Sequence, residues 1–232
     1  MNAPPNPADV RVIVRARDEA ATLDGVLDEL LAAGYGVVVV DDGSFDATAE
    51  IAAARGVVVV RHAINLGPGA ALQTGLTAAL ATDARFLVTF DADGQHRVAD
   101  IPTVNAPLAA GEADVVFGSR FLRAEDRRRV PPGRRLLLRG AVLVNALLTG
   151  RLLSDAHNGL RAFTRPAAAA IELHETSFAY ATELLEQILR ERLRLVEVPV
   201  TVSYTQHSLR KGQSGWNAVN VVLDFLAGKV LR

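Results

Sequence analysis

The stretch Val37-Val-Val-Val-Asp41-Asp42-Gly43-Ser44 joins a β-branched run to two acids and a glycine turn. A short apolar run without alternation is typical of a strand that helices cover on both faces of its sheet. Helical patterns precede and follow this run in the chain, and such alternation indicates βαβ units. The stretch therefore predicts a strand at residues 37–40 of a mostly parallel sheet.

The same alternation of strands and helices extends from Val10 to Phe117. The other predicted strands are residues 10–14, 57–60, 86–90 and 113–117, and the predicted helices are residues 20–33, 46–55, 69–81 and 98–110. This order predicts a Rossmann-like, doubly wound α/β fold, in which ligands bind at the carboxyl ends of the strands.

The pattern changes after Arg120. An arginine-rich connector leads into an amphipathic stretch at residues 134–153, which is followed by a helix at 178–194, a strand at 195–204 and a final helix at 216–231. At the other end, residues 1–9 hold three prolines and no apolar run, which predicts a disordered tail rather than a signal peptide.

The composition excludes several classes of protein. Of the 232 residues, 50% are hydrophobic and 22% are charged, with no cysteine and a formal net charge of −1. These values exclude a largely disordered chain and a disulfide-stabilised one, and the near-neutral charge argues against nucleic-acid binding. No run approaches the ~20 apolar residues that cross a bilayer. We therefore expect a cytoplasmic protein whose membrane contacts are peripheral.

Asp41 and Asp42 end the strand predicted at 37–40 and precede Gly43. Acids at the carboxyl end of a strand can accept hydrogen bonds from a ribose hydroxyl or a base N–H. They can equally form a turn that caps the next helix. We expect Asp42 to bind a ligand and Asp46 to cap the helix.

The strand predicted at 86–90 is followed by Asp91-Ala92-Asp93-Gly94-Gln95-His96. Residues two apart in an extended chain face the same way, so Asp91 and Asp93 can present oxygens to one hard cation, Mg²⁺ or Mn²⁺. Such a cation suits a diphosphate leaving group. An isolated D-x-D more often faces water, but here acids end two strands of one sheet, where a cation makes their charges tolerable.

A third element, Asn65-Leu-Gly67-Pro-Gly69-Ala70, leads into the helix predicted at 69–81. Glycines before a helix let the backbone approach a ligand, and the helix N-terminus favours anions. A tight strand-to-helix turn explains the same residues. The run matches neither G-x-G-x-x-G nor G-x-x-x-x-G-K-[ST], which argues against dinucleotide and P-loop sites.

Together these motifs resemble the family 2 glycosyltransferases, and within them the dolichol- or polyprenyl-phosphate sugar transferases. The resemblance extends from about Val10 to Gly215 and is carried by the ordered series Val14-Arg-Ala-Arg-Asp-Glu-Ala20, Val40-Asp-Asp-Gly-Ser44, Asn65-Leu-Gly-Pro-Gly69, Asp91-Ala-Asp-Gly-Gln-His96, Phe117-Gly-Ser-Arg120, Asp155-Ala-His-Asn-Gly-Leu-Arg161 and Glu197-Val-Pro-Val200. It implies a GT-A fold, with a nucleotide-sugar-binding half at 10–120 and an acceptor-side half at 121–232 that adds helices and a strand to the same domain.

The resemblance also implies roles for residues at the matching positions. The first motif and the second acid of Asp41-Asp42 hold the nucleotide, with Arg15 in place of the family's usual proline and Arg17 in place of its usual tyrosine. The D-x-D binds the metal and the diphosphate, and Arg120 is expected near a phosphate. The implied nucleotide-sugar contacts are Arg15, Arg17, Glu19, Val40, Asp42, Asp91, Ala92, Gln95 and Arg120, and the implied metal ligands are Asp91, Asp93 and Gln95.

Residues of the second half are expected on the acceptor side. Arg134, Arg135 and Arg139 begin an arginine-and-leucine helix suited to a membrane interface, and the resemblance implies that this segment lies beside a lipid acceptor. A solvated charged face and a buried core helix are the alternatives. His157 and Asn158 either line the acceptor site or close a turn.

Catalytic roles are expected for Asp93 and, if the acceptor needs a base, for Glu183, whose alternative is a solvated helix position. In the resembling family, the loop that matches residues 210–214 closes over the diphosphate. Arg210 and Lys211 are therefore expected to clamp the donor. Trp216 and the following helix seal the domain, contact lipid or pair with a second subunit.

The sequence thus predicts a metal-dependent, inverting glycosyltransferase at the cytoplasmic face of a membrane, which moves a sugar from a nucleotide donor to a polyprenyl phosphate. A related alternative transfers the sugar to a growing glycan or another acceptor. Alternatives of other classes are a nucleotidyltransferase, whose glycine-rich loop after the first strand is absent, and a non-catalytic sugar-nucleotide-binding subunit, which the intact Asp91 and Asp93 disfavour. A membrane-protein partner or a homodimer is compatible with the sequence.

Overall fold

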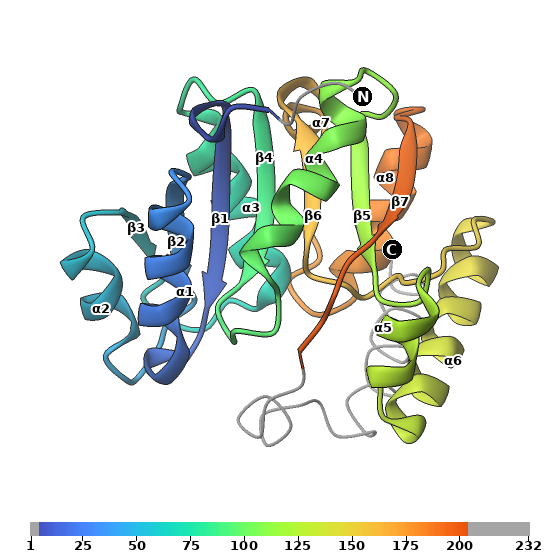
Figure 1. The fold of residues 1–232 in the computed structure, drawn as a ribbon, viewed down its shortest axis with the longest axis horizontal. Coiled ribbons are helices and arrows are strands. Elements are labelled where there is room, and N and C mark those ends of the chain that lie inside the picture. The colour runs from blue at the N-terminus through green and yellow to red at the C-terminus, as the bar shows by residue number, and fades with distance from the viewer. Residues whose placement is uncertain (1–4, 204–232) are drawn as a thin grey trace.

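The computed structural model describes residues 5–203, which form a seven-stranded sheet between two layers of helices (Figure 1). The strand order is β3-β2-β1-β4-β6-β5-β7, and neighbours are parallel except where β6 pairs with β4 and β5. The strands are β1 (Val10–Ala16), β2 (Gly36–Asp41), β3 (Val58–Arg61), β4 (Phe86–Asp91), β5 (Val115–Ser119), β6 (Arg161–Thr164) and β7 (Leu195–Pro199). The predicted doubly wound, mostly parallel fold is confirmed.

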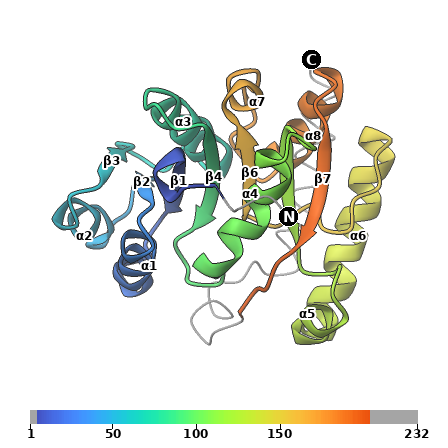
Figure 2. The same cartoon turned by 45° about the horizontal axis from the view of Figure 1, so that its top comes forward.

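Helices cover both faces of the sheet (Figures 1 and 2). One face carries α1 (Ala20–Ala32), α2 (Thr48–Ala54) and α4 (Ile101–Ala109), and the other carries α3 (Pro68–Leu80), α7 (Arg165–Ala169) and α8 (Tyr180–Arg190). The remaining helices, α5 (Ala124–Arg129) and α6 (Pro132–Thr149), lie beside the β7 edge. They lie toward the end of the sheet at which β1 finishes.

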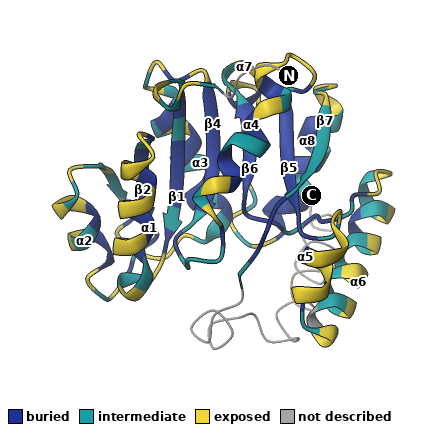
Figure 3. Cartoon of the chain, in the orientation of Figure 1, coloured by how far each residue is buried: buried dark blue, intermediate teal, exposed yellow. Residues whose placement is uncertain are grey.

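The apolar runs of the strands are continuous because both faces of the sheet are buried (Figure 3). In β2, Val37 and Val39 belong to the core beneath α1 and α2, whereas Val38 and Val40 belong to the core beneath α3. Burying such a side chain contributes about 1.5–3 kcal/mol. A single strand therefore holds both helix layers to the sheet.

The N-terminal segment is more ordered than the sequence predicts. Pro7–Asp9 form a 3₁₀ turn, and the Asn6 side chain accepts a hydrogen bond from the Ala8 N–H at its start. The Asp9 carbonyl accepts a further bond from the Arg85 N–H at 2.8 Å. The prediction of a disordered tail is therefore wrong for residues 7–9.

The second half of the chain contains elements that the sequence does not predict. These are β6, α7 and the short helix α5, which occupies part of the arginine-rich connector. β6 begins with Arg161, which is only 2% exposed, and a charged residue at a buried strand position weakens the local pattern. The strand forms because antiparallel pairing with β4 and β5 fills the place between them, and local patterns do not report such pairing.

Candidate active site

Acids cluster at the carboxyl ends of β2 and β4, and arginines of neighbouring strands meet them there. The parallel register sets Arg15 of β1 opposite Asp91 of β4, and Asp41 of β2 opposite Arg61 of β3. Both pairs form ion pairs, and Arg61 Nε lies 3.1 Å from Asp41 Oδ2. Arginines therefore compensate the charges of Asp41 and Asp91. The expectation that these two acids need a bound cation for this purpose is wrong.

Asp42 forms hydrogen bonds to the segment before α3, and its nucleotide contact stays a prediction. One carboxylate oxygen lies 2.8 Å from His62 Nδ1 and accepts a bond from the Leu66 N–H at 2.8 Å, and the other accepts from the Gly67 N–H at 2.9 Å. The residue is only 5% exposed. Val40 is fully buried beneath α3, and its predicted place at the nucleotide stays a prediction.

The glycines at the start of α3 allow the loop before α8 to approach the backbone closely. Gly67 has a φ of 100°, a conformation that favours glycine, and the Gly69 N–H donates to the Thr176 carbonyl at 2.9 Å. A Cβ atom at Gly69 would lie 1.9 Å from the Glu175 carbonyl oxygen. The loop before α8 therefore covers the start of α3, which favours the turn interpretation over an anion site.

The β1–α1 and β2–α2 loops bind each other. Asp46 accepts bonds at 3.0 Å from the Thr48 N–H at the start of α2 and from the Ala20 N–H at the start of α1, which confirms its predicted capping role. The Glu19 N–H donates to Thr48 Oγ1 at 2.9 Å. The Arg17 side chain is 46% exposed. Arg17, a residue of the motif at 14–20, therefore presents its side chain to solvent beside the hydrogen bonds that join the two loops.

Asp91 is enclosed by basic groups and backbone. One oxygen pairs with the Arg15 guanidinium, the other lies 3.3 Å from His96 Nε2, and a Cβ atom on Gly159 would lie 1.9 Å from that second oxygen. Burial works to raise the pKa of Asp91, but Arg15 and His96 hold it well below its usual range. Ala92 is buried, so a side-chain contact from it to the donor is excluded.

Asp93 carries a negative charge that no described basic side chain pairs with. Its carboxylate accepts bonds from the Gln95 backbone N–H at 3.0 Å and from the Gln95 side-chain amide at 2.6 Å. Burial and the charge of Asp91 raise the pKa of Asp93, and Glu19 adds to this effect, while His96 and the Gln95 N–H partly offset it. A carboxylate in this setting favours a nearby cation.

The oxygens of Asp93 and Gln95 fit a hard divalent cation. Mg²⁺ is commonly bound through one or two carboxylates while substrate phosphates and water complete its shell. Among residues 5–203, no group of three or more His, Asp or Glu side chains is arranged to hold a metal without such help. The oxygens of Asp93 and Gln95 leave the other ligand positions of such a cation to phosphate oxygens and water.

Tyr180 and Arg161 form a buried extension of this site that sequence reasoning misses. Arg15 Nη1 donates to the Tyr180 hydroxyl at 2.9 Å, and the Arg161 guanidinium lies 5.5 Å from the Tyr180 ring centroid. Burial works to raise the pKa of Tyr180, but the two arginines lower it. Arg161 is the last residue of the motif at 155–161, and this place is the one sign of it in the sequence. No local pattern marks Tyr180.

Arg120, predicted near a phosphate, forms a buried ion pair with Asp155. Arg120 Nε lies 2.6 Å from Asp155 Oδ2, and the two side chains are 5% and 1% exposed. The guanidinium also donates to the His157 carbonyl at 3.1 Å. This pair joins the end of β5 to the loop before β6.

His157 and Asn158 lie in that same loop. Burial, with Arg161 nearby, lowers the pKa of His157 to about 4, so its imidazole is neutral at neutral pH. Asn158 Oδ1 accepts a bond from the Leu160 N–H at 2.9 Å, while its amide nitrogen is buried without a partner in the described chain. Asn158 therefore closes a turn, and acceptor contacts of both residues stay a prediction.

Glu183 holds a loop. Its carboxylate accepts bonds from the N–H groups of His174 at 3.1 Å and Glu175 at 2.8 Å. That loop is the one that covers the start of α3. Glu183 therefore positions this loop, and its role as a catalytic base stays a prediction.

α6 displays a stripe of leucines to solvent. Leu136, Leu143 and Leu147 are 76%, 60% and 86% exposed, and their spacing places them on one helical face. On another face, Asn145 Nδ2 donates to Thr182 Oγ1 of α8 at 3.3 Å. No helix within residues 5–203 is long and apolar enough to cross a membrane.

The arginines of α6 differ in their surroundings. Arg135 donates to the Arg127 carbonyl at 2.9 Å and to the Val130 carbonyl at 3.1 Å, so it caps the end of α5, and its lipid contact stays a prediction. Arg139 is exposed. The Arg134 side chain, like Arg210, Lys211 and Trp216, lies outside the described part of the structure. Ser203, the last described residue, donates its N–H to the Gln95 carbonyl at 2.8 Å beside the D-x-D loop.

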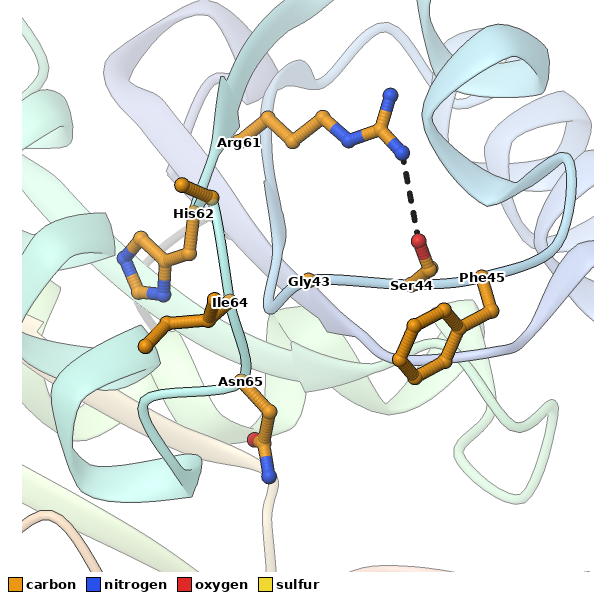
Figure 4. Close-up of a pocket in the computed structure, with 8 residues that line it drawn as sticks. Gly43, Ser44, Phe45, Arg61, His62, Ile64 and Asn65 are labelled. Carbon is orange, nitrogen blue, oxygen red and sulfur yellow. Dashed lines mark hydrogen bonds between the residues drawn. The ribbon is translucent and has the colours of Figure 1, made fainter.

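A hollow of about 440 Å³ opens beside the ends of β2 and β3 (Figure 4). It is lined by Gly43, Ser44, Phe45, Arg61, His62, Ala63, Ile64 and Asn65. Phe45 is 93% exposed, and Arg61 Nη2 donates to the Ser44 carbonyl at 3.3 Å. An exposed aromatic ring beside a hollow can stack on a flat ligand. Phe45 directly follows the Asp41-Asp-Gly-Ser44 run, but no local pattern marks its ring as a ligand contact.

The fold, with acids and a hollow at the carboxyl ends of its strands, is that of the GT-A glycosyltransferases. Among solved structures, glucosyl-3-phosphoglycerate synthase from Mycobacterium tuberculosis, crystallised with Mn²⁺, UDP and phosphoglyceric acid, matches with a TM-score of 0.69 and 21% identity over 93% of this chain and 78% of that one. The model of glycosyl transferase family 2 matches residues 11–171, and the chain belongs to this family.

Relatives match nearly the whole chain. An uncharacterized protein of Methanocaldococcus jannaschii is 33% identical over 97% of this chain and 94% of its own length. A UDP-N-acetylglucosamine–dolichyl-phosphate N-acetylglucosaminyltransferase of Methanococcus voltae is 29% identical over 96% of this chain and 98% of its own length. The resemblance seen in the sequence motifs is therefore confirmed, and the protein is a glycosyltransferase.

Proposed function

We propose that this glycosyltransferase moves a sugar from a nucleotide-sugar donor to a polyprenyl phosphate with the help of a divalent cation. The observation that carries the proposal is Asp93, a carboxylate that hydrogen-bonds Gln95 and forms no close ion pair among the described residues, at the edge where this fold binds ligands. The acceptor class is supported by the relative of Methanococcus voltae, which is named for transfer to dolichyl phosphate and spans the same length.

The chain's own residues have separate tasks in this reaction. Asp93 and Gln95 hold the cation, which when bound offsets the charge that develops on the departing diphosphate. Phe45 and the hollow beside it offer the nucleotide base a stacking surface. The acceptor oxygen attacks from the opposite side of the sugar, which inverts the anomeric configuration. A lipid phosphate is already anionic near neutral pH and needs little help from a base, which agrees with the engagement of Glu183 by backbone N–H groups.

Thermal unfolding with a panel of sugar nucleotides tests the donor and the cation together. A ligand at 100 times its Kd stabilises the folded state by about 2.7 kcal/mol, which corresponds to roughly 5–10 °C for a domain of this size. We expect one donor to raise Tm with Mn²⁺ and to lose this effect in EDTA. Stabilisation by nucleoside triphosphates alone would contradict the proposal and indicate a nucleotidyltransferase.

The leucine stripe of α6 supports binding at the surface of a membrane, and the cytoplasmic side of that membrane is part of the proposal. Leu136, Leu143 and Leu147 form one apolar face with Arg139 on the same helix, and helices of this kind lie in membrane interfaces. Because α6 lies toward the end of the sheet that carries the site (Figure 1), a membrane there would bring a lipid phosphate close to the donor.

Replacing Leu136, Leu143 and Leu147 together with glutamine should reduce sedimentation with anionic vesicles by more than about tenfold, because each buried leucine contributes about 1.5–3 kcal/mol. Leu31→Gln on α1 is the control, since Leu31 is also exposed but lies on a different helix. It should sediment like the wild type. Equal sedimentation of the triple variant would contradict the membrane-binding role of α6.

A further inference from the structure

We propose that Thr201 is a positioning residue of the transfer reaction, which holds the D-x-D loop (residues 91–96) in place by tying residues 200–203 to α5. The inference rests on the proposed function, because it concerns how tightly the same site binds the nucleotide of the donor. Thr201 directly follows the Glu197-Val-Pro-Val200 motif and belongs to no motif itself, so its role follows from contacts in the fold.

Residues 200–203 form a strap that follows β7 and reaches the D-x-D loop. Figure 1 shows this segment, the red end of the described chain, running from β7 past β5 toward the end of the sheet at which β4 finishes. Val202 pairs with His96 as an isolated antiparallel bridge, and the Ser203 N–H donates to the Gln95 carbonyl at 2.8 Å. Because these are backbone contacts, the position of the strap sets the position of the loop.

Thr201 binds two buried carboxylates that belong to different elements. Its N–H donates to Asp100 Oδ2 at 2.8 Å, and its hydroxyl donates to Asp126 Oδ1 at 2.9 Å. Asp100 is 7% exposed and ends the 3₁₀ turn Val98–Asp100 before α4, whereas Asp126 is 4% exposed and belongs to α5. The two hydrogen bonds therefore join the strap to the start of α4 and to α5.

The attachment of α5 depends on the Thr201 hydroxyl. Asp126 is the one buried residue of α5, and its second oxygen accepts no hydrogen bond within residues 5–203. Arg123 Nη1 lies 3.8 Å from that oxygen, but the Arg123 side chain is 42% exposed, so water weakens this ion pair. Loss of the hydrogen bond from Thr201 would leave the buried carboxylate poorly satisfied, which is costly. The hydroxyl therefore fixes α5 to the strap.

The helix pair α5–α6 has a second polar attachment, which provides a comparison. Asn145 of α6 donates to Thr182 of α8 at 3.3 Å, and Thr182 is 7% exposed. This contact also joins the helix pair to a buried threonine, but it reaches α8 instead of the strap. If the two threonines served only the stability of the fold, removing either hydroxyl would leave nucleotide binding unchanged.

Isothermal titration calorimetry with UDP and with GDP, each in the presence of Mn²⁺, tests the Thr201 hydroxyl. Thr201→Val keeps the size of the side chain and should raise the Kd of the nucleotide that the wild type binds more tightly by about tenfold or more, since a displacement of about 1 Å in a site can cost about 100-fold in rate. Thr201→Ser keeps the hydroxyl and should bind within about threefold of the wild type. Thr182→Val, the matched control, should also bind within about threefold of the wild type.

A double variant separates nucleotide binding from stability. Thr201→Val alone leaves Asp126 buried without its hydrogen bond and should lower Tm by roughly 2–12 °C. Combining it with Asp126→Leu should recover most of this loss, because replacing both partners of a buried hydrogen bond with apolar groups is often nearly neutral. The nucleotide Kd of the double variant should stay raised, because the strap still lacks its hydrogen bond to α5.

The outcomes separate this inference from the proposed function. The inference is wrong, while the nucleotide donor stays part of the reaction, if Thr201→Val binds as tightly as the wild type or if Thr201→Ser binds as weakly as Thr201→Val. It is also wrong if Thr182→Val weakens binding equally, or if the double variant recovers the wild-type Kd. If the wild-type protein binds neither UDP nor GDP, both the inference and the donor of the proposed function are wrong.

Discussion

Asp93→Asn is expected to lower kcat by about a thousandfold or more, the scale on which loss of a group that stabilises developing charge acts. Asparagine keeps the size of the side chain but removes the charge that holds the cation. The folded protein should remain at least as stable, because the pKa of Asp93 is raised in the native state. Its ionised form then costs folding free energy, and this cost appears as the pH rises through the raised pKa. Steady-state turnover and Tm measure the two effects.

Asp83→Asn is the matched control for this substitution. Asp83 is exposed and precedes the opposite end of the same strand, β4, so its variant should turn over substrate like the wild type. Turnover of Asp93→Asn within about threefold of the wild type, or wild-type turnover that persists in excess EDTA, contradicts the central role given to this carboxylate.

The first half of the fold can be predicted from the sequence because its strands carry their own signal. The valines of β2 are buried on both faces, so the apolar run is continuous and its position is clear. β6 gives no such signal, because Arg161 begins it and its pairing partners lie far away in the chain. Local patterns report propensity and burial, but they do not report which strand fills a place in the sheet.

For the acids of the site, too, the sequence predicts their positions but not their partners. Their positions at the carboxyl ends of β2 and β4 follow from the strand pattern, and Asp46 caps as predicted. Their partners do not follow from it, because Asp91 meets Arg15 through the register of two strands and Asp42 meets the N–H groups of residues 66–67. Acids that look alike in the sequence therefore have different partners in the fold.

Asp155→Ala should produce the largest loss of stability, because it leaves the Arg120 guanidinium charged and buried. The pair is 5% and 1% exposed, and Asp155 also accepts a bond from the Arg120 N–H at 3.2 Å. Breaking a buried pair from one side costs about 3–5 kcal/mol, which corresponds to roughly 6–20 °C in Tm for this size. Thermal unfolding followed by circular dichroism measures the shift.

Asp28→Ala is the control, since it removes an aspartate from an exposed arginine pair. Asp28 and Arg55 are 59% and 30% exposed, and Arg55 keeps a second partner in Asp24, so the loss should stay below about 1 kcal/mol. A Tm for Asp155→Ala equal to that of Asp28→Ala would contradict the prediction. Arg120→Met combined with Asp155→Leu should recover most of the stability, because replacing both buried charges with apolar groups is often neutral. A stable double variant without turnover would indicate that the pair also serves the reaction.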